Sequence, residues 1–74
     1  MNIGSAQIRA ARGLLNWSGE RLSRASGVSL STIRRAEAGK DVLPLVSRAL
    51  RDAFEKAGIE FTNGDEPGVK LRKQ

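Results

Sequence analysis

Two adjacent arginines and several hydroxyl side chains lie within one short stretch of the chain, GVSLSTIRRAEAG at residues 27–39. Arg34 and Arg35 supply the cations, and Ser29 and Ser31 supply hydroxyls just before them. Guanidinium and hydroxyl groups donate hydrogen bonds to phosphate oxygens, and an arginine can also donate two bonds to the edge of a guanine base. The stretch therefore indicates either a helix that contacts nucleic acid or the solvated back of a core helix.

The charge balance of the whole chain bears on this choice. Its 74 residues include 13 lysines and arginines against 8 acidic residues, which gives a formal net charge of +5. An excess of this kind favours a polyanionic partner, although net charge also serves solubility. Placement of the cations must therefore decide between the two interpretations.

The residue types that are missing exclude several functions. The chain has no cysteine and no histidine, so neither a disulfide nor an ordinary zinc site is expected. No histidine is present to activate a serine, and we expect neither an enzyme nor a cofactor. No apolar run approaches the roughly 20 residues that span a bilayer, and a secretory signal is not recognisable. These features predict a soluble intracellular protein without a membrane partner.

Apolar residues at intervals of three and four predict four helices, over residues 5–15, 18–26, 29–38 and 44–57. Serines stand where an N-cap is needed before three of them, namely Ser5, Ser18 and Ser29. Glycines follow the last three helices as stops, namely Gly27, Gly39 and Gly58. Pro44 suits the first turn of the fourth helix. We therefore expect a mainly α fold.

A β-hairpin is predicted after the helices. Residues 59–62 and 69–72 alternate between apolar and polar types, and residues 63–68 are rich in turn formers. A lone hairpin is not stable in water, so its apolar face must pack on the helices or on another chain. That face consists of Ile59, Phe61, Val69 and Leu71.

The second and third helices meet across a three-residue turn, Gly27-Val28-Ser29. Two short helices joined by such a turn form the helix-turn-helix motif. Ile33 and Ala36 supply a narrow apolar face for the third helix. The remaining face carries Leu30, Ser31, Arg34 and Arg35, which we expect to point away from the core.

The segment LLNWSGERLSRASGVSLSTIRRAEAG resembles the helix-turn-helix of Cro and the phage repressors, the XRE family. The resemblance covers roughly residues 7–54 and implies a four-helix, lambda-repressor-like DNA-binding domain at residues 1–58. The tail GIEF…GVKLRK resembles that of small bacterial regulators in which a hairpin follows the helices. Residues 59–74 would then be a hairpin and tail that serve as a dimerisation element.

The same resemblance assigns base contacts to the helix at 29–38. Leu30, Ser31 and Arg35 would face base edges in the major groove. Arg35 would donate to guanine O6 and N7, and Leu30 would touch a thymine methyl.

The resemblance also implies contacts with the phosphate backbone. The family often has a glutamine where this chain has Gly19, so only backbone contact is available there. The family also often has an asparagine at the position of Ala38, which shifts phosphate binding toward basic residues. The expected contacts outside the base-facing set are Ser18, Gly19, Ser29, Thr32, Arg34, Lys40 and Arg48.

Glu37 is implied to have a structural role. In the family a glutamate at this position pairs with an arginine of the first helix, and Arg12 matches that arginine. The resemblance therefore implies an Arg12–Glu37 ion pair rather than a catalytic carboxylate.

The resemblance implies two functions, each for a protein of the bacterial cytoplasm that is associated with the nucleoid. The first is a transcriptional regulator of the repressor type, which binds double-stranded DNA as a homodimer on an inverted repeat. The hairpin could pair with its copy through an exposed strand edge. The second is an antitoxin or an adaptor that uses the same fold to bind a protein partner, a toxin or another regulator.

Overall fold

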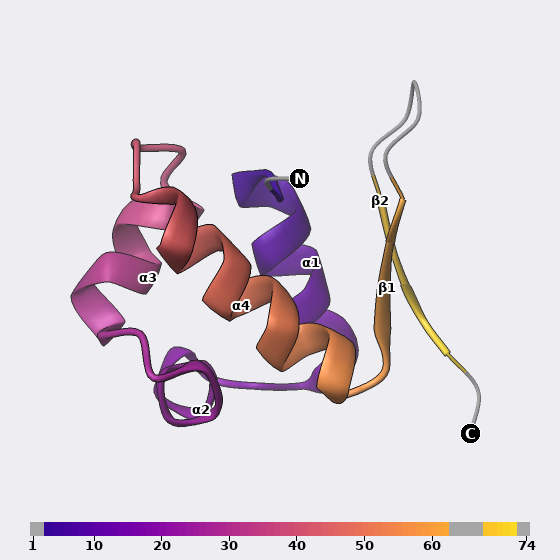
Figure 1. The fold of residues 1–74 in the computed structure, drawn as a ribbon. Helices are drawn as coiled ribbons and strands as arrows, with labels where there is room; N and C mark the ends of the chain where they lie inside the picture. Colours follow the sequence, from indigo (N-terminus) through magenta and orange to yellow (C-terminus); the bar gives the residue numbers. More distant parts are fainter. Residues whose placement is uncertain (1–2, 63–67, 73–74) are drawn as a thin grey trace.

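The computed structural model describes residues 3–62 and 68–72, and within these ranges the chain forms four helices followed by a two-stranded hairpin (Figure 1). The elements are α1 (Ser5–Leu15), α2 (Gly19–Ser26), α3 (Leu30–Glu37), α4 (Pro44–Lys56), β1 (Ile59–Thr62) and β2 (Gly68–Leu71). The predicted mainly α fold with a C-terminal hairpin is confirmed.

Serine side chains cap two of the helices as predicted. The Ser18 hydroxyl accepts a hydrogen bond from the backbone N–H of Arg21 (3.0 Å), and the Ser29 hydroxyl accepts one from Thr32 (3.3 Å). The predicted cap at Ser5 is wrong, because Ser5 is the first residue of α1 and Gly4 is the N-cap. Gly4 has no side chain that could accept from the first N–H groups of α1, and the helix start is instead held by a side chain that accepts from the N–H of Gly4 itself.

The turn between α2 and α3 is held by backbone geometry and by two serines of α2. Gly27 adopts φ 77°, a left-handed conformation that favours glycine and ends α2. Ser26 Oγ accepts from the N–H of Val28 (3.1 Å), and Ser23 Oγ donates to the Val28 carbonyl (2.7 Å). Both backbone polar groups of Val28 therefore have partners while its side chain is buried.

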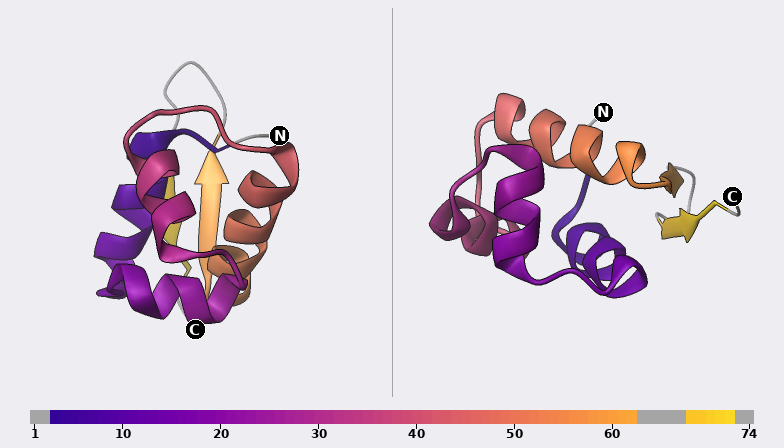
Figure 2. Two further views of the ribbon diagram at one scale, coloured as in Figure 1. Left: turned by 90° about the vertical axis from the view of Figure 1, so that its left-hand side faces the viewer. Right: turned by 90° about the horizontal axis from the view of Figure 1, so that it is seen from below.

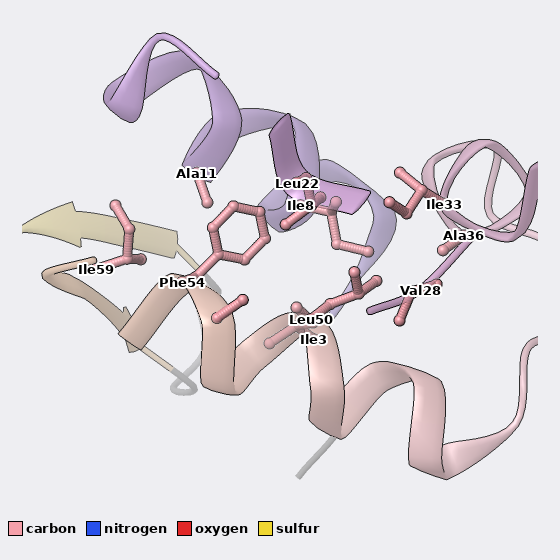
Figure 3. Packing of buried hydrophobic residues seen from close by; sticks show 11 residues of the cluster. Ile3, Ile8, Ala11, Leu22, Val28, Ile33, Ala36, Leu50, Phe54 and Ile59 are labelled. Atoms are coloured by element: carbon pink, nitrogen blue, oxygen red, sulfur yellow. The ribbon is translucent and has the colours of Figure 1, made fainter. Parts of the chain in front are cut away.

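Every helix and the hairpin contribute to one apolar core (Figure 3). Its largest fully buried side chains are Phe54, Leu22, Ile33, Leu50 and Ile59. Trp17 stacks on Phe54 with ring centroids 6.0 Å apart, and Phe61 meets the same ring edge-on at 6.0 Å. The two shorter helices, α2 and α3, are two turns each, so their stability depends on this packing rather than on helix propensity.

The hairpin packs on helices of its own chain, β2 against α1 and β1 against α4 (Figures 1 and 2). The strands are antiparallel, with Ile59 opposite Leu71 and Phe61 opposite Val69, so these four residues share one face. The second strand begins at Gly68, one residue before its predicted start, because Gly68 pairs with Thr62. Most of the predicted loop at 63–68 lies outside the described residues.

One buried polar side chain joins the N-terminus to the hairpin. Gln7 Nε2 donates to the carbonyls of Thr62 (3.3 Å) and Gly68 (3.0 Å), and Gln7 Oε1 accepts from the N–H of Gly4 (2.8 Å). The amide thus satisfies groups on both strands at the same end of the hairpin. It also supplies the acceptor at the start of α1.

We predict that Gln7→Met, which keeps the length of the side chain, lowers the free energy of unfolding by about 1–3 kcal/mol. The substitution leaves backbone groups of Gly4, Thr62 and Gly68 without their partners. Urea unfolding measures the loss. Ala10→Met, at an exposed position of the same helix, is the control and should change stability by less than about 0.5 kcal/mol. Equal effects would show that Gln7 does not hold the hairpin.

Candidate nucleic-acid interface

Helix α3 lies at the end of the molecule opposite the hairpin (Figures 1 and 2). Ile33 and Ala36 point into the core, with exposed fractions of 1% and 6% (Figure 3). Ser31, Arg34 and Arg35 on the other face are exposed. The eight residues of α3 therefore divide into a buried face and a free face, as the sequence predicts.

Hydroxyl groups cluster at the start of α3. Ser29 Oγ donates to Thr32 Oγ1 (2.8 Å) and lies 3.4 Å from Ser31 Oγ. Since Ser29 is the donor to Thr32, the Thr32 hydroxyl keeps its own proton for another acceptor. The cluster adds hydroxyl donors to the positive end of the α3 helix dipole, which favours anions.

The two arginines differ in their surroundings. Within the part of the chain that the structure describes, no hydrogen bond or ion pair holds the exposed side chain of Arg34. The Arg35 guanidinium instead turns toward the segment after α3, where Nη2 donates to the carbonyl of Asp41 (3.3 Å). A shallow hollow between these side chains is lined by Leu30, Ser31, Arg34, Arg35, Ala38 and Lys40.

The start of α2 touches the start of α3 through Gly19 and Leu30. A Cβ built on Gly19 would lie only 2.8 Å from Leu30 Cδ1. Any side chain at position 19 would therefore displace the leucine, and Leu30 is half-buried where it stands. The family often has a glutamine at position 19. In this chain the residue is glycine, and the side chain of Leu30 fills the space that a side chain at position 19 would occupy.

The same contact brings the candidate residues of the two helices together. Ser18 is exposed and caps α2, next to Gly19. Lys40 is exposed just beyond the end of α3. Arg48 is exposed on α4, outside the residues that line the hollow of α3.

An ion pair ties the end of α3 to α1. Arg12 Nε and Nη2 donate to the two carboxylate oxygens of Glu37 at 2.6 and 3.0 Å. The side chains are 27% and 14% exposed, and Arg12 Nη1 also donates to the Trp17 carbonyl (3.0 Å). The hydrogen bond with Glu37 raises the pKa of Arg12 above its ordinary value. Arg9 donates to the backbone carbonyl of Glu37, so α1 holds this helix end at two points.

The family comparison agrees with this geometry. A helix-turn-helix family model matches residues 8–59, which run from Ile8 within α1 through α4 to the first residue of β1. The chain belongs to the helix-turn-helix family of the Cro and phage-repressor type. No curated protein matches the chain.

Members of this helix-turn-helix family are DNA-binding transcription regulators, and double-stranded DNA is accordingly the partner class of this chain. Among the described residues, no group of acidic side chains is placed to hold a metal ion. None of the described helices has the length and apolar character needed to cross a membrane.

Several contacts in this helix-turn-helix have no signal in the sequence. The Gly19–Leu30 contact and the Arg35–Asp41 hydrogen bond join residues on different elements. The guanidinium carbon Cζ of Arg21 lies 5.3 Å from the centre of the Trp17 ring. This cation–π contact holds Arg21 beside the N-terminus of α2.

We predict that Glu37→Gln lowers the free energy of unfolding by about 1.5–3 kcal/mol, because it leaves the partly buried charge of Arg12 without its counter-ion. Glu55→Gln is the matched control. It removes the same charge from the Arg51–Glu55 pair one turn apart on α4, whose carboxylate is 40% exposed against 14% for Glu37. Helical pairs of this kind contribute little, so the loss should be less than about 0.5 kcal/mol. Chemical denaturation of the three proteins measures the difference, and similar losses for both variants would contradict a special role for Glu37.

Proposed function

We propose that this protein is a repressor-type transcriptional regulator that binds an inverted repeat in bacterial DNA as a homodimer. The observation that carries the proposal is the division of α3, with Ile33 and Ala36 in the core and Arg34 and Arg35 exposed at one end of the molecule. A two-turn helix presented in this way fits the major groove, which is about 12 Å wide. One such helix contacts only a few base pairs, so useful specificity requires two copies.

In this proposal Arg35, Ser31 and Leu30 face the base edges. The hydrogen bond of Arg35 to the Asp41 carbonyl engages one of five guanidinium N–H groups, which leaves donors for guanine O6 and N7. That bond also limits the rotamers of Arg35 before DNA binds. Leu30 has no donor, and its methyl groups suit the methyl of a thymine.

Phosphate contacts flank the bases. Arg34 is free to bind a phosphate, and the spare proton of the Thr32 hydroxyl supports the same role. At the start of α2, the Ser18 hydroxyl and the backbone N–H of Gly19 would donate hydrogen bonds to a phosphate of the DNA backbone beside the groove. Lys40 extends this set past the end of α3, and Ser29 acts through its cap of the helix.

The proposal distinguishes the two arginines experimentally. Selection from a random pool of duplex DNA should enrich an inverted repeat, and we predict that Arg35→Ala weakens binding to it by about 1–3 kcal/mol and relaxes preference at one base pair. Arg34→Ala should weaken binding to all sequences alike and flatten the salt dependence by about one unit of slope. Affinities over a series of salt concentrations measure both effects.

Lys56→Ala, which removes one charge at the exposed end of α4 far from α3, is the control for net charge. If neither arginine variant differs from Lys56→Ala, the groove assignment is wrong. The antitoxin or adaptor function, which needs a protein partner and no base contact from α3, would then be the better explanation.

The role of Leu30 can be tested by removing a single methyl group from the DNA. Replacing the thymines of the selected half-site one at a time with deoxyuridine should weaken binding severalfold at one position. We predict that Leu30→Ala abolishes this difference. Gly19→Ala should reduce it as well, because the added Cβ displaces Leu30 Cδ1 from its place. A thymine preference that survives both substitutions would contradict the contact.

A further inference from the structure

The two most exposed large apolar side chains of the described residues stand on either side of Pro44. Leu43 is 71% exposed and Leu45 is 70% exposed, against 45% for Leu14 and 43% for Leu71. Val42 and Val46 lie half-buried beside them. Val42, Leu43 and Val46 line a hollow that Thr32 and Arg35 of α3 also line. We call these four residues, Val42, Leu43, Leu45 and Val46, the leucine patch. It adjoins the exposed face of α3.

We propose that the leucine patch is the surface on which a second copy of this chain docks, with the two-fold axis beside Leu45. The inference rests on the proposed function, since it names the surface through which the DNA-binding dimer forms. In a two-fold contact the same patch is used by both copies, so an apolar patch meets an apolar patch. Leu43 and Leu45 have no role in the core that would otherwise account for them.

The charges around the patch suit a copy of itself. Asp41 is exposed two residues before Leu43, and Arg48 is exposed one helical turn after Leu45. We place this two-fold axis at right angles to the chain at Leu45, so that the two chains run in opposite directions there. The residue that precedes the patch in one copy therefore lies near the residue that follows it in the other. Asp41 of each copy would face Arg48 of its partner, which places Arg48 at the interface rather than on phosphate.

The spacing of DNA half-sites also favours this surface. Inverted half-sites one helical turn apart are separated by about 34 Å. The longest extent of the described part of the molecule is 30 Å, and α3 and the hairpin lie at its opposite ends (Figures 1 and 2). Pairing through the outer face of the hairpin, which points away from α3, would separate the two α3 helices by a distance approaching twice that extent. Pairing through the leucine patch places them side by side.

The hairpin has less apolar surface to offer a partner. Ile59 is 1% exposed within its own chain, and Phe61 and Val69 are half-buried against the same core. Of the four residues on that face, Leu71 alone is substantially exposed, and less so than either leucine of the patch. The edges of the strands remain available for backbone pairing, and the experiment below separates that arrangement from ours.

The test uses the full chain in sedimentation equilibrium, alone and with the inverted repeat recovered from the random pool. The wild type should form a dimer in at least one of these conditions. Leu43→Ser with Leu45→Gln should raise the dimer dissociation constant by about a hundredfold or more. Leu43 already has the extended backbone of an N-cap, with φ −62° and ψ 144°, so a serine there suits the monomer and thermal unfolding should show an intact fold.

Leu14→Gln and Leu71→Gln are the matched controls, since they remove exposed leucines from α1 and from the hairpin. Both should dimerise like the wild type. Asp41→Arg and Arg48→Asp should each weaken the dimer about tenfold, and the double variant should restore it.

Three outcomes would overturn the inference. These are a wild type that is monomeric both alone and on the repeat, loss of the dimer in Leu71→Gln but not in the patch variant, and a patch variant that dimerises unchanged. The last two leave the proposed function standing if the random pool still yields a sequence whose binding depends on Arg35. A wild type that is monomeric on the repeat would also remove the homodimer from the proposed function and leave only base recognition by Arg35. A pool that yields no sequence would instead count against the proposed function.

Discussion

The orientation of α3 depends on the bidentate ion pair between Arg12 and Glu37. Two turns of helix bury only Ile33 and Ala36 deeply, and apolar contacts of this size leave a short helix free to rotate about its axis. The ion pair removes that freedom because both carboxylate oxygens are engaged, at 2.6 and 3.0 Å, by a planar guanidinium. Arg9 adds a second point of attachment at the carbonyl of Glu37. Arg9 and Arg12 of α1 thus fix the direction in which the exposed arginines of α3 point, through contacts with Glu37 at the other side of α3.

Much of the architecture was predictable because its determinants are local. Ser18 and Ser29 accept from N–H groups three residues ahead, and Gly27 takes a left-handed conformation, so a few neighbouring residues specify each helix end. The prediction for Ser5 was wrong because the helix begins one residue earlier than a Ser5 cap requires, with Gly4 as its N-cap held through its N–H by Gln7. Its other two hydrogen bonds reach the hairpin more than fifty residues away, and no local pattern reveals a residue of that kind.

The candidate site was predictable to the level of a helix face and no further. Periodicity separates Ile33 and Ala36 from Arg34 and Arg35, but it does not show that Arg35 turns toward the Asp41 carbonyl while Arg34 has no partner among the described residues. Nor does it show that Leu30 occupies the space above Gly19. These are contacts between elements, and they depend on how closely α2 and α3 approach across their turn. The exposure of Leu43 is not visible in the sequence either, because Leu43 stands three residues before Val46 and so continues the apolar spacing of α4.

The connection between α3 and α4 joins the two halves of the proposed function. Its Asp41 carbonyl restrains Arg35, and its valine and leucine side chains line the hollow that Arg35 shares. A second copy docked on Leu43 and Leu45 would therefore contact the connection between α3 and α4, which holds Arg35 through the Asp41 carbonyl. Dimer formation and base recognition would then be coupled through a few residues, because a shift of this segment on docking changes the acceptor that Arg35 uses. Thermodynamic linkage is reciprocal. If dimer formation increases the affinity for DNA by some factor, DNA that binds Arg35 in its groove increases the affinity between the two copies by the same factor.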